Sequence, residues 1–245
     1  MVGASDATAS THIRFLHAVP GGPGANLTVA GAKGSSADIK NVTFGHASGY
    51  ATGPHGKVSL TLSAGGKKLA SAPATLVDKH HYTVVAEKGK SGIDFKIYRA
   101  GKAVAGKARL RAVHAAPELG KVDMTVGSKK WGTIGFGQTT GYERTTPGTF
   151  DVAARMPAKQ SVLVQAKGVN LAAGTASTAY AIGSSGERTR IVLVQDSVAA
   201  PKGAPETGLG GMSQPAGGTP WLAALIAALA AGTLGGVAYS RRGHA

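Results

Sequence analysis

The stretch Ile13-Arg-Phe-Leu-His-Ala-Val-Pro20 decides the fold, because it recurs 97 residues later as Leu110-Arg-Ala-Val-His-Ala-Ala-Pro117. A second stretch, Phe44-Gly-His-Ala-Ser-Gly-Tyr50, recurs 92 residues later as Phe136-Gly-Gln-Thr-Thr-Gly-Tyr142. The two motifs keep their order, and the offset changes by only a few residues, as insertions in loops allow. A period of about 95 residues is that of a domain rather than of a solenoid unit.

Short apolar-alternating runs separated by turn residues surround these motifs. Examples are Val58-Ser-Leu-Thr-Leu62, Tyr82-Thr-Val-Val-Ala86, Phe95-Lys-Ile-Tyr98, Val122-Asp-Met-Thr-Val126 and Ile191-Val-Leu-Val194, with turns such as Ala64-Gly-Gly66 and Pro147-Gly148. Alternation with a period of two indicates half-buried strands. The sequence therefore predicts an all-β fold of two tandem β-sandwich-like (Ig-like) domains at residues 11–104 and 105–199, without specifying the strand order.

The two repeated motifs together resemble a known bacterial family. A strand ending His-Ala-x-Pro, followed by Phe-Gly-x-x-(Ser/Thr)-Gly-Tyr, is similar to the family catalogued as domain of unknown function 4397, common in exported actinobacterial proteins. The resemblance extends over about residues 11–199 and implies an all-β, surface-associated module without enzymatic activity. An acidic position in the strand after the first motif is Asp123 in the second copy and Asn26 in the first.

The C-terminal region predicts a membrane anchor. The segment from Trp221 to Tyr239 carries no charged residue, and a helix of that length spans about 30 Å, the thickness of a hydrocarbon core. The rings of Trp221 and Tyr239 suit the two interfaces, and Arg241 and Arg242 favour the cytoplasmic side. We therefore expect a transmembrane anchor at residues 220–240.

This anchor sets the expected topology of the whole chain. Residues 241–245 would form a basic cytoplasmic tail, and residues 200–219, rich in Gly and Pro, a flexible stalk. Residues 1–10 form an N-terminal tail in which no export signal is visible. The alternatives are a buried Ala-rich core helix and a tail-anchored protein that faces the cytoplasm.

A second way of attachment is encoded in the stalk. Ala204, Pro205, Glu206, Thr207 and Gly208 differ by one residue from the Leu-Pro-x-Thr-Gly signal that sortases read. Cleavage between Thr207 and Gly208 would attach the protein covalently to peptidoglycan. Retention as a membrane anchor is the interpretation we favour.

The charge indicates what kind of partner to expect. The chain has 27 Lys and Arg against 12 Asp and Glu, a formal net charge of +15 that is spread over both repeats. Such a field favours anionic surfaces, namely membrane lipid headgroups and anionic cell-wall polymer or peptidoglycan. Nucleic acid is not expected as a partner, because no nucleic-acid reading module accompanies the charge.

Two pairs of repeated residues are candidate ligand-binding positions. His17 and His114 occupy the same place in the repeat, where each can instead hydrogen-bond the turn made by Pro20 or Pro117. Tyr50 and Tyr142 could form a carbohydrate-stacking platform, or lay their rings over the core with the hydroxyls satisfied at the rim.

The sequence predicts no metal site, cofactor or catalytic residue. Four other histidines of the first copy are not repeated in the second, where we align His46, His55, His80 and His81 with Gln138, Pro147, Thr178 and Ala179 or their neighbours. The chain has no cysteine, no Gly-x-Ser-x-Gly elbow and no phosphate-binding loop motif. The hypotheses, in order, are a structural or adhesive surface module, a receptor-like module for a small ligand or carbohydrate, and an enzyme.

Overall fold

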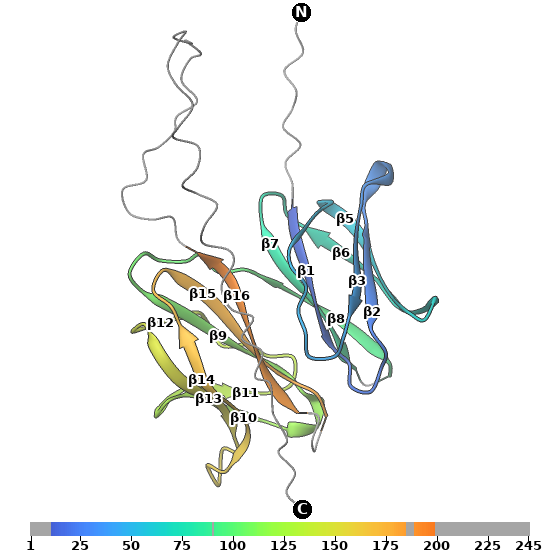
Figure 1. Cartoon of the computed structure of the whole chain (residues 1–245). Helices are drawn as coiled ribbons and strands as arrows, with labels where there is room; N and C mark the ends of the chain where they lie inside the picture. The colour runs from blue at the N-terminus through green and yellow to red at the C-terminus, as the bar shows by residue number, and fades with distance from the viewer. Residues whose placement is uncertain (1–10, 90, 185–188, 199–245) are drawn as a thin grey trace, which may run out of the picture. The chain divides into compact units, whose positions relative to one another are not determined.

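A computed structural model describes residues 11–89, 91–184 and 189–198, and this part of the chain is all-β (Figure 1). Two short 3-10 turns, η1 (Ala32–Gly34) and η2 (Pro117–Leu119), interrupt the strands. The all-β class predicted from the sequence is confirmed for these residues.

The first eight strands form two four-stranded sheets. The strands are β1 (Thr11–Ala18), β2 (Ala25–Ala30), β3 (Ser36–Val42), β4 (Ala51–Gly53), β5 (Gly56–Ala64), β6 (Lys67–Leu76), β7 (His81–Lys88) and β8 (Ile93–Arg99). One sheet has the order β3-β2-β5-β6 and the other β4-β1-β7-β8. Apolar side chains from both sheets share one core, so the two sheets form a sandwich.

The next eight strands repeat this arrangement. The strands are β9 (Ala108–Ala115), β10 (Val122–Val126), β11 (Lys129–Ile134), β12 (Glu143–Thr145), β13 (Gly148–Arg155), β14 (Val162–Leu171), β15 (Thr175–Ile182) and β16 (Arg190–Val198). Their sheets have the orders β11-β10-β13-β14 and β12-β9-β15-β16, which are the first two orders with eight added to each strand number. The periodicity of the sequence is thus matched strand for strand in space.

The strand order, which the sequence does not specify, differs from that of an immunoglobulin domain. In each half the first strand pairs in parallel with the seventh, as β1 with β7 and β9 with β15. Immunoglobulin sandwiches join strands ABED in one sheet and CFG in the other. Of those pairs only the second with the fifth strand is found here. The sandwich prediction holds, whereas its Ig-like specification does not.

Burial along the strands shows that the halves pack on each other. In β5 buried and less buried positions largely alternate, as expected for a strand with one face on a core. In β7 and β15 the alternation is lost, because both faces are covered. One face of β7 contributes Val84 to the core of its sandwich, and the other contributes Val85 to a separate cluster.

This separate cluster, here called the interface layer, joins the two sandwiches. Its buried members are Leu16, Ala18, Val85 and Tyr98 from the first half, and Val113, Ala115, Tyr180, Ile182 and Val194 from the second. The predicted boundary between residues 104 and 105 falls between β8 and β9. The two halves nevertheless belong to one compact unit.

A carboxyl group is buried beside this layer. Glu87 is fully buried on the same face of β7 as Val85, and neither carboxylate oxygen has a hydrogen-bond partner among the described residues. Burial raises the pKa of Glu87 from 4.5 to about 7, with Lys96 opposing and Asp94 adding to the shift. The hydroxyls of Tyr98 and Tyr180 also lack a described partner.

Several predicted segments lie outside the described residues. These are the N-terminal tail, the stalk, the transmembrane anchor with Trp221, Tyr239, Arg241 and Arg242, and the sortase-like sequence from Ala204 to Gly208. Within residues 11–89, 91–184 and 189–198, no helix is long and apolar enough to cross a bilayer.

Replacement Glu87→Gln should change how stability depends on pH. The folded state holds the Glu87 proton up to about pH 7, and the unfolded chain releases it near 4.5, so folding binds a proton between these values. This group should therefore lower the free energy of unfolding progressively from pH 4.5 to 7, by roughly 3 kcal/mol in total. Chemical denaturation at several pH values should show that slope in the natural protein and not in the variant.

The control for this experiment is Glu143→Gln, at a partly exposed carboxylate that pairs with Lys129. The control variant should keep the pH slope of the natural protein. An unchanged slope in Glu87→Gln would contradict the prediction.

Candidate functional site

Two buried arginines lie at equivalent positions of the repeat. Arg14 on β1 and Arg111 on β9 are the second residues of the motifs that begin at Ile13 and Leu110. The Nε of Arg14 donates to Thr83 Oγ1 at 2.8 Å, and that of Arg111 to Thr178 Oγ1 at 3.2 Å. Each threonine lies directly opposite its arginine on the neighbouring parallel strand.

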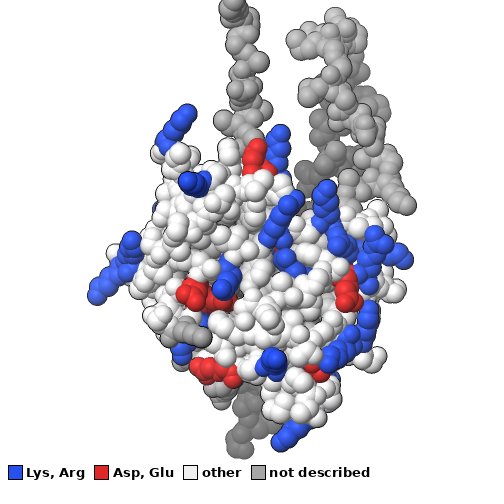
Figure 2. Space-filling model, turned by 180° about the vertical axis from the view of Figure 1, so that it is seen from behind, with Lys and Arg blue, Asp and Glu red and all other residues white. Residues whose placement is uncertain are grey.

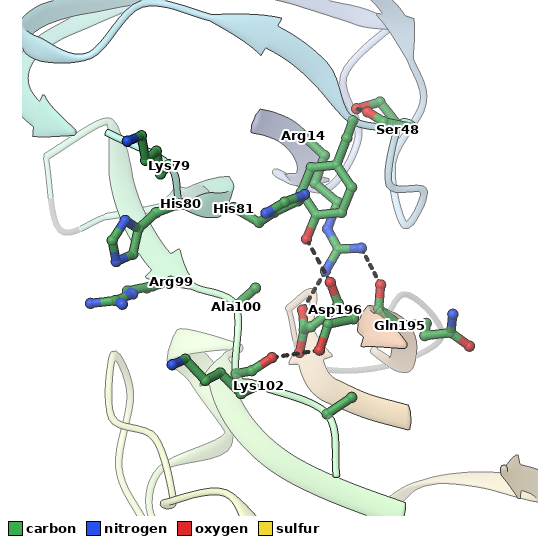
Figure 3. Close-up of a pocket in the computed structure, with 15 residues that line it drawn as sticks. Arg14, Ser48, Lys79, His80, His81, Arg99, Ala100, Lys102, Gln195 and Asp196 are labelled. Atoms are coloured by element: carbon green, nitrogen blue, oxygen red, sulfur yellow. Dashed lines mark hydrogen bonds and ion pairs between the residues drawn. The ribbon is translucent and has the colours of Figure 1, made fainter. Parts of the chain in front are cut away.

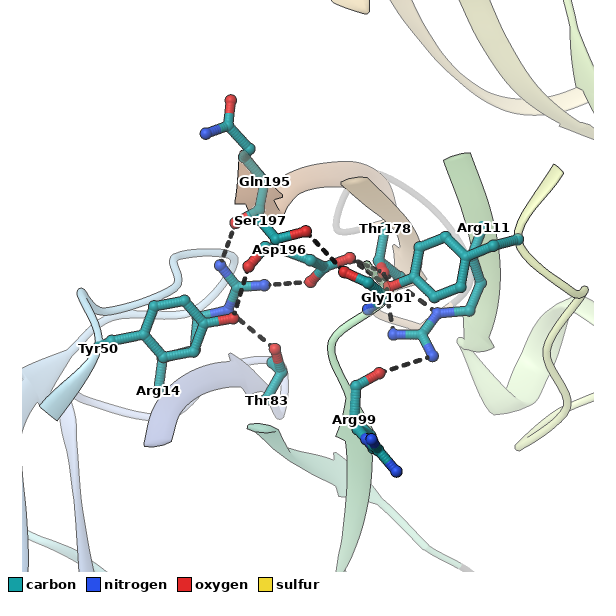
Figure 4. A network of polar contacts seen from close by, with 11 residues as sticks. Arg14, Tyr50, Thr83, Arg99, Gly101, Arg111, Thr178, Gln195, Asp196 and Ser197 are labelled. Atoms are coloured by element: carbon teal, nitrogen blue, oxygen red, sulfur yellow. Dashed lines mark hydrogen bonds and ion pairs between the residues drawn. The ribbon is translucent and has the colours of Figure 1, made fainter. Parts of the chain in front are cut away.

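Each arginine also reaches across to the other half. Arg14 Nη1 donates to the carbonyl of Gln195 at 2.6 Å, and Arg111 Nη1 to the carbonyl of Arg99 at 3.2 Å. Gln195 and Arg99 occupy corresponding places near the ends of β16 and β8. The two halves therefore exchange nearly symmetric contacts (Figure 4).

Asp196 breaks this symmetry. Its carboxylate forms a buried ion pair with Arg14 and accepts hydrogen bonds from the hydroxyls of Thr178 and Tyr142, both at 2.5 Å (Figure 4). The corresponding residue after β8 is Ala100, which offers no carboxylate. One acid of the second half thus binds the arginine of the first half and the hydroxyls of its own half.

Tyr142 also takes part in these contacts between the halves. Its hydroxyl accepts the N–H of Gly101 at 3.0 Å, and Arg111 lies over its ring at 4.4 Å. A Cβ on Gly101 would lie 2.6 Å from the ring carbons, so the backbone between the halves rests directly on the ring. Burial, followed by the charge of Asp196, raises the pKa of Tyr142 to about 12. The hydroxyl is satisfied as predicted, and Gly101 and Arg111 cover the ring that was considered as a stacking platform.

Tyr50 occupies the corresponding position in the first half and remains half-buried. Its hydroxyl donates to the carbonyl of Asp196 at 3.3 Å, and Arg14 lies over its ring at 4.6 Å. The ring of His81 meets it edge-on at 4.9 Å. Burial raises the pKa of Tyr50, whereas the charge of Arg14 lowers it.

The two histidines of the repeat fix loops. His114 Nε2 lies 2.6 Å from the carbonyl of Gly120, and its Nδ1 accepts the N–H of Ala116 at 3.3 Å. This is the predicted hydrogen bond to the turn around Pro117. His17 is buried in the same way, burial lowers its pKa, and a hydrogen bond to the backbone of Pro23 opposes that shift. Neither histidine is among the residues that line the cleft described next.

A cleft of about 850 Å³ opens between the two halves on the side of Tyr50 (Figure 3). Its lining comes from β1, the loop before β4, the turn before β7 and the first residue of that strand, the end of β8 and the segment after it, and the end of β16. The lining residues are Arg14, Ser48, Gly49, Tyr50, Lys79, His80, His81, Arg99, Ala100, Gly101, Lys102, Ala103, Gln195, Asp196 and Ser197.

The cleft is electrostatically one-sided. Lys79, Arg99 and Lys102 are exposed on its walls, and Figure 3 shows them bordering the same open space. Asp196 is the one acidic residue in the lining, and its carboxylate is already paired with Arg14. The cleft therefore presents uncompensated positive charge to solvent.

Lys79 adopts an unusual backbone conformation in this wall. Its φ is 57°, in the left-handed region that non-glycine residues rarely adopt. The N–H of Lys79 is held by the side chain of Asp78 at 2.6 Å. In the second half the corresponding residue is Gly174, with φ of 72°.

The neighbouring histidines are also confined to the first half. The strand registers align His80 and His81 with Thr175 and Ala176, three residues before the positions that the sequence alignment assigned to them. His12 and His81 stack at 4.5 Å. Burial lowers the pKa of His81, and His12, Arg14 and His80 lower it further.

The segment between the halves occupies the equivalent place in the second half. Gly101 rests on Tyr142, and its carbonyl accepts a hydrogen bond from Ser197 Oγ at 2.6 Å. The next carbonyl, of Lys102, accepts from Arg109 Nη1 at 2.6 Å. The duplicated fold therefore provides two related positions, one filled by this segment and one open beside Tyr50.

The remaining candidate residues have structural contacts. The carboxylate of Asp123 pairs with Lys130 at 2.8 Å and accepts from Thr133 and Gln160, which lowers its pKa to about 2. Asn26 Oδ1 accepts the N–H of Asn41 at 2.7 Å. In the described part of the chain, no group of three or more His, Asp or Glu side chains is placed to hold a metal ion.

Sequence reasoning missed most residues of this site. Arg14 and Arg111 lie in the repeated motif, whose pattern predicts strands and does not single out these two side chains. Their recurrence between apolar residues was the available signal, because a charge that recurs within a buried strand needs a partner. No local pattern marked Asp196, Arg99 or Lys102.

The fold and cleft define a β-sandwich protein with two interlocked halves. Residues 11–125 match the family described as Domain of unknown function (DUF4397), which supports the resemblance deduced from the motifs. The match ends within β10, so membership of the whole second copy stays a prediction.

The solved structures that match include one chain for which the similarity can be described. It is from Bacteroides thetaiotaomicron VPI-5482 and is described as a candidate polysaccharide binding protein (DUF1812). It is 7% identical, with coverage of 76% of this chain and 96% of that chain and a TM-score of 0.23. No curated protein matched the chain.

Replacement Asp196→Asn should weaken the whole structure. It removes the charge that neutralises Arg14, leaving a buried cation without its counterion. Breaking a buried pair in this way costs about 3 kcal/mol or more, measurable as a loss in the free energy of unfolding. Glu143→Gln, which breaks an exposed pair, should cost less than about 1 kcal/mol. Equal small losses in both variants would contradict this role of Asp196.

Proposed function

We propose that this chain is a non-enzymatic protein of the bacterial cell surface that binds anionic envelope polymer. Its two interlocked sandwiches are displayed outside the cell and contact the polymer through their positively charged surface. The role is structural or adhesive. In this proposal the C-terminal segment attaches the protein to the membrane.

The distribution of charge is the observation that carries this proposal. Exposed lysines occur on many elements of both halves, including Lys40, Lys57, Lys67, Lys68, Lys121, Lys159 and Lys167. On the face drawn in Figure 2, lysine and arginine side chains are spread widely and acidic ones are few. A polyanion can therefore make several simultaneous contacts, each of them weak.

The contacts between the two sandwiches support a binding role. The interface layer and the Arg14–Asp196 ion pair hold the two halves as one unit. Positive groups on both halves can then contact one polymer chain together.

Binding to an anionic polymer should depend strongly on salt. Purified poly(glycerol phosphate) should bind at low ionic strength and lose about tenfold or more in affinity at about 0.5 M NaCl, because exposed charges are screened over a few ångströms there. Neutral dextran of similar length is the control probe and should not bind. Affinity that is the same at both salt concentrations would refute the electrostatic mechanism.

The proposed location can be tested in cells. Protease added to intact cells should digest the region of the sandwiches, and a version lacking residues 220–245 should leave the membrane fraction. Mass spectrometry of the C-terminus distinguishes an intact anchor from a chain that ends at Thr207, the product expected of a sortase. Inaccessibility to protease, or unchanged membrane partitioning of the truncated version, would disprove the proposed location.

A further inference from the structure

We propose that the cleft beside Tyr50 is a discrete binding site for one acidic unit of a glycopolymer, a sugar or polyol that carries a phosphate or a carboxylate. This inference rests on the proposed function and adds to it a defined site, a ligand class and a stoichiometry. Diffuse attraction alone would need no such site.

Three cationic side chains line the cleft. Lys79 lies in the turn before β7, Arg99 is the last residue of β8 and Lys102 follows that strand, and all three border the same cavity. The lining carboxylate, Asp196, is neutralised by Arg14. An anion in the cleft would gain from three cations without meeting an unpaired acid.

Lys79 has a left-handed backbone conformation that lysine rarely adopts. The turn before β7 requires a left-handed residue, and the second half uses Gly174 there, the residue type for which this conformation costs least. The first half instead places a long cation at this strained position, on the wall of the cleft. Strain retained where an unstrained residue serves the same fold indicates a role for the side chain.

The two halves carry different side chains around the turn before β7 and the equivalent turn before β15. Lys79, His80 and His81 correspond to Gly174, Thr175 and Ala176. Because the second half folds with the same strand order without any of these cationic or titratable side chains, the fold does not require them. They are concentrated in the half whose cleft is open.

The cleft also offers contacts for the uncharged part of the ligand. The half-buried ring of Tyr50 lines the cleft together with Ser48 and the backbone of Gly49. Because Arg14 lies over the Tyr50 ring and His81 meets it edge-on, this ring offers a sugar an apolar contact at the cleft wall and not an open stacking platform. The carbonyl and hydroxyl groups of the lining suit the hydroxyls of a sugar. The cavity, of about 850 Å³, lies within the usual range of pockets for small ligands.

In the second half, the position equivalent to the cleft is occupied by the segment between the halves, which limits the number of ligand sites per chain. There the backbone of Gly101 and Lys102 lies against Tyr142 and Arg109. The equivalent position is therefore closed to a ligand. One ligand unit per chain is expected, although the fold is duplicated.

The decisive experiment compares a cleft variant with a charge-matched surface variant. The cleft variant is Lys79→Gly, Arg99→Gln and Lys102→Gln, and the control is Lys57→Gln, Lys67→Gln and Lys68→Gln on β5 and β6. The probes are a short glycerol phosphate oligomer and a galacturonic acid trimer, titrated calorimetrically at fixed salt. Both variants lose the same number of charges, so a difference between them reports the cleft.

We expect at least one probe to bind the natural protein with one site per chain. The cleft variant should lose about tenfold or more in affinity, and the surface variant less than about threefold. Binding of the phosphate probe alone or of the uronate probe alone would support the site and identify its anion. Equal affinity in the two variants would refute the cleft while leaving polymer binding to the overall charge intact.

Lys79→Gly alone provides a test that a folding defect cannot imitate. Glycine is the residue of the second half at this turn, so the unfolding temperature should stay the same or rise. Affinity for the probe should nevertheless fall about two- to fivefold, as expected for the loss of one exposed charge contact. A variant that binds as tightly as the natural protein would remove Lys79 from the site.

A measurement on the natural protein completes the test. Burial, followed by the charges of His12, Arg14 and His80, lowers the pKa of His81. An anion in the cleft would offset them, so NMR titration should show the pKa of His81 rising when the probe is bound. The exposed His55, which does not line the cleft, serves as the internal control. No change at His81 under saturating probe would place the ligand elsewhere.

Discussion

The ion pair between Arg14 and Asp196 is the constraint on which the relation of the two halves depends. It joins the first strand of the first half to the last strand of the second, and both side chains are almost completely buried. A buried charge is tolerated only with a partner and with its remaining hydrogen bonds satisfied. Thr83 and the carbonyl of Gln195 satisfy Arg14, and Thr178 and Tyr142 satisfy Asp196. The interface layer contributes buried apolar surface to the contact between the halves, and this ion pair fixes how they align.

The same arrangement explains why a duplicated protein has an asymmetric site. Two equivalent tyrosines and two equivalent arginines face each other across the layer, but there is one carboxylate between them. A second acid in place of Ala100 would put two buried negative charges close together, which is costly. The segment between the halves, which can lie on only one side, rests on Tyr142 and leaves the position beside Tyr50 open.

The sequence predicted those features that depend on local patterns. The alternating run from Val58 to Leu62 lies in β5, and the Gly65-Gly66 turn joins β5 to β6 with both glycines at positive φ. It did not predict the interface layer, because a strand buried on both faces, such as β15, has no alternation to detect. Nor could it pair Arg14 with Asp196, since 182 residues separate them. The αL conformation of Lys79 was equally hidden, because a lysine gives no sequence signal for it.

The parallel pairing of β1 with β7 has a consequence for how the chain acquires its structure. Arg14 and Thr83, whose side chains are hydrogen-bonded, are 69 positions apart. In the second half, β9 likewise pairs with β15, which comes much later in the sequence. Each half can complete the sheet that contains its first strand, β4-β1-β7-β8 or β12-β9-β15-β16, only after nearly all of its own residues are available. Pairings between such distant segments carry a large loop-closure entropy and are typical of slowly folding β proteins. Until these pairings form, the apolar side chains of the two sheets lack their native partners, and incompletely folded chains of this kind are prone to aggregation.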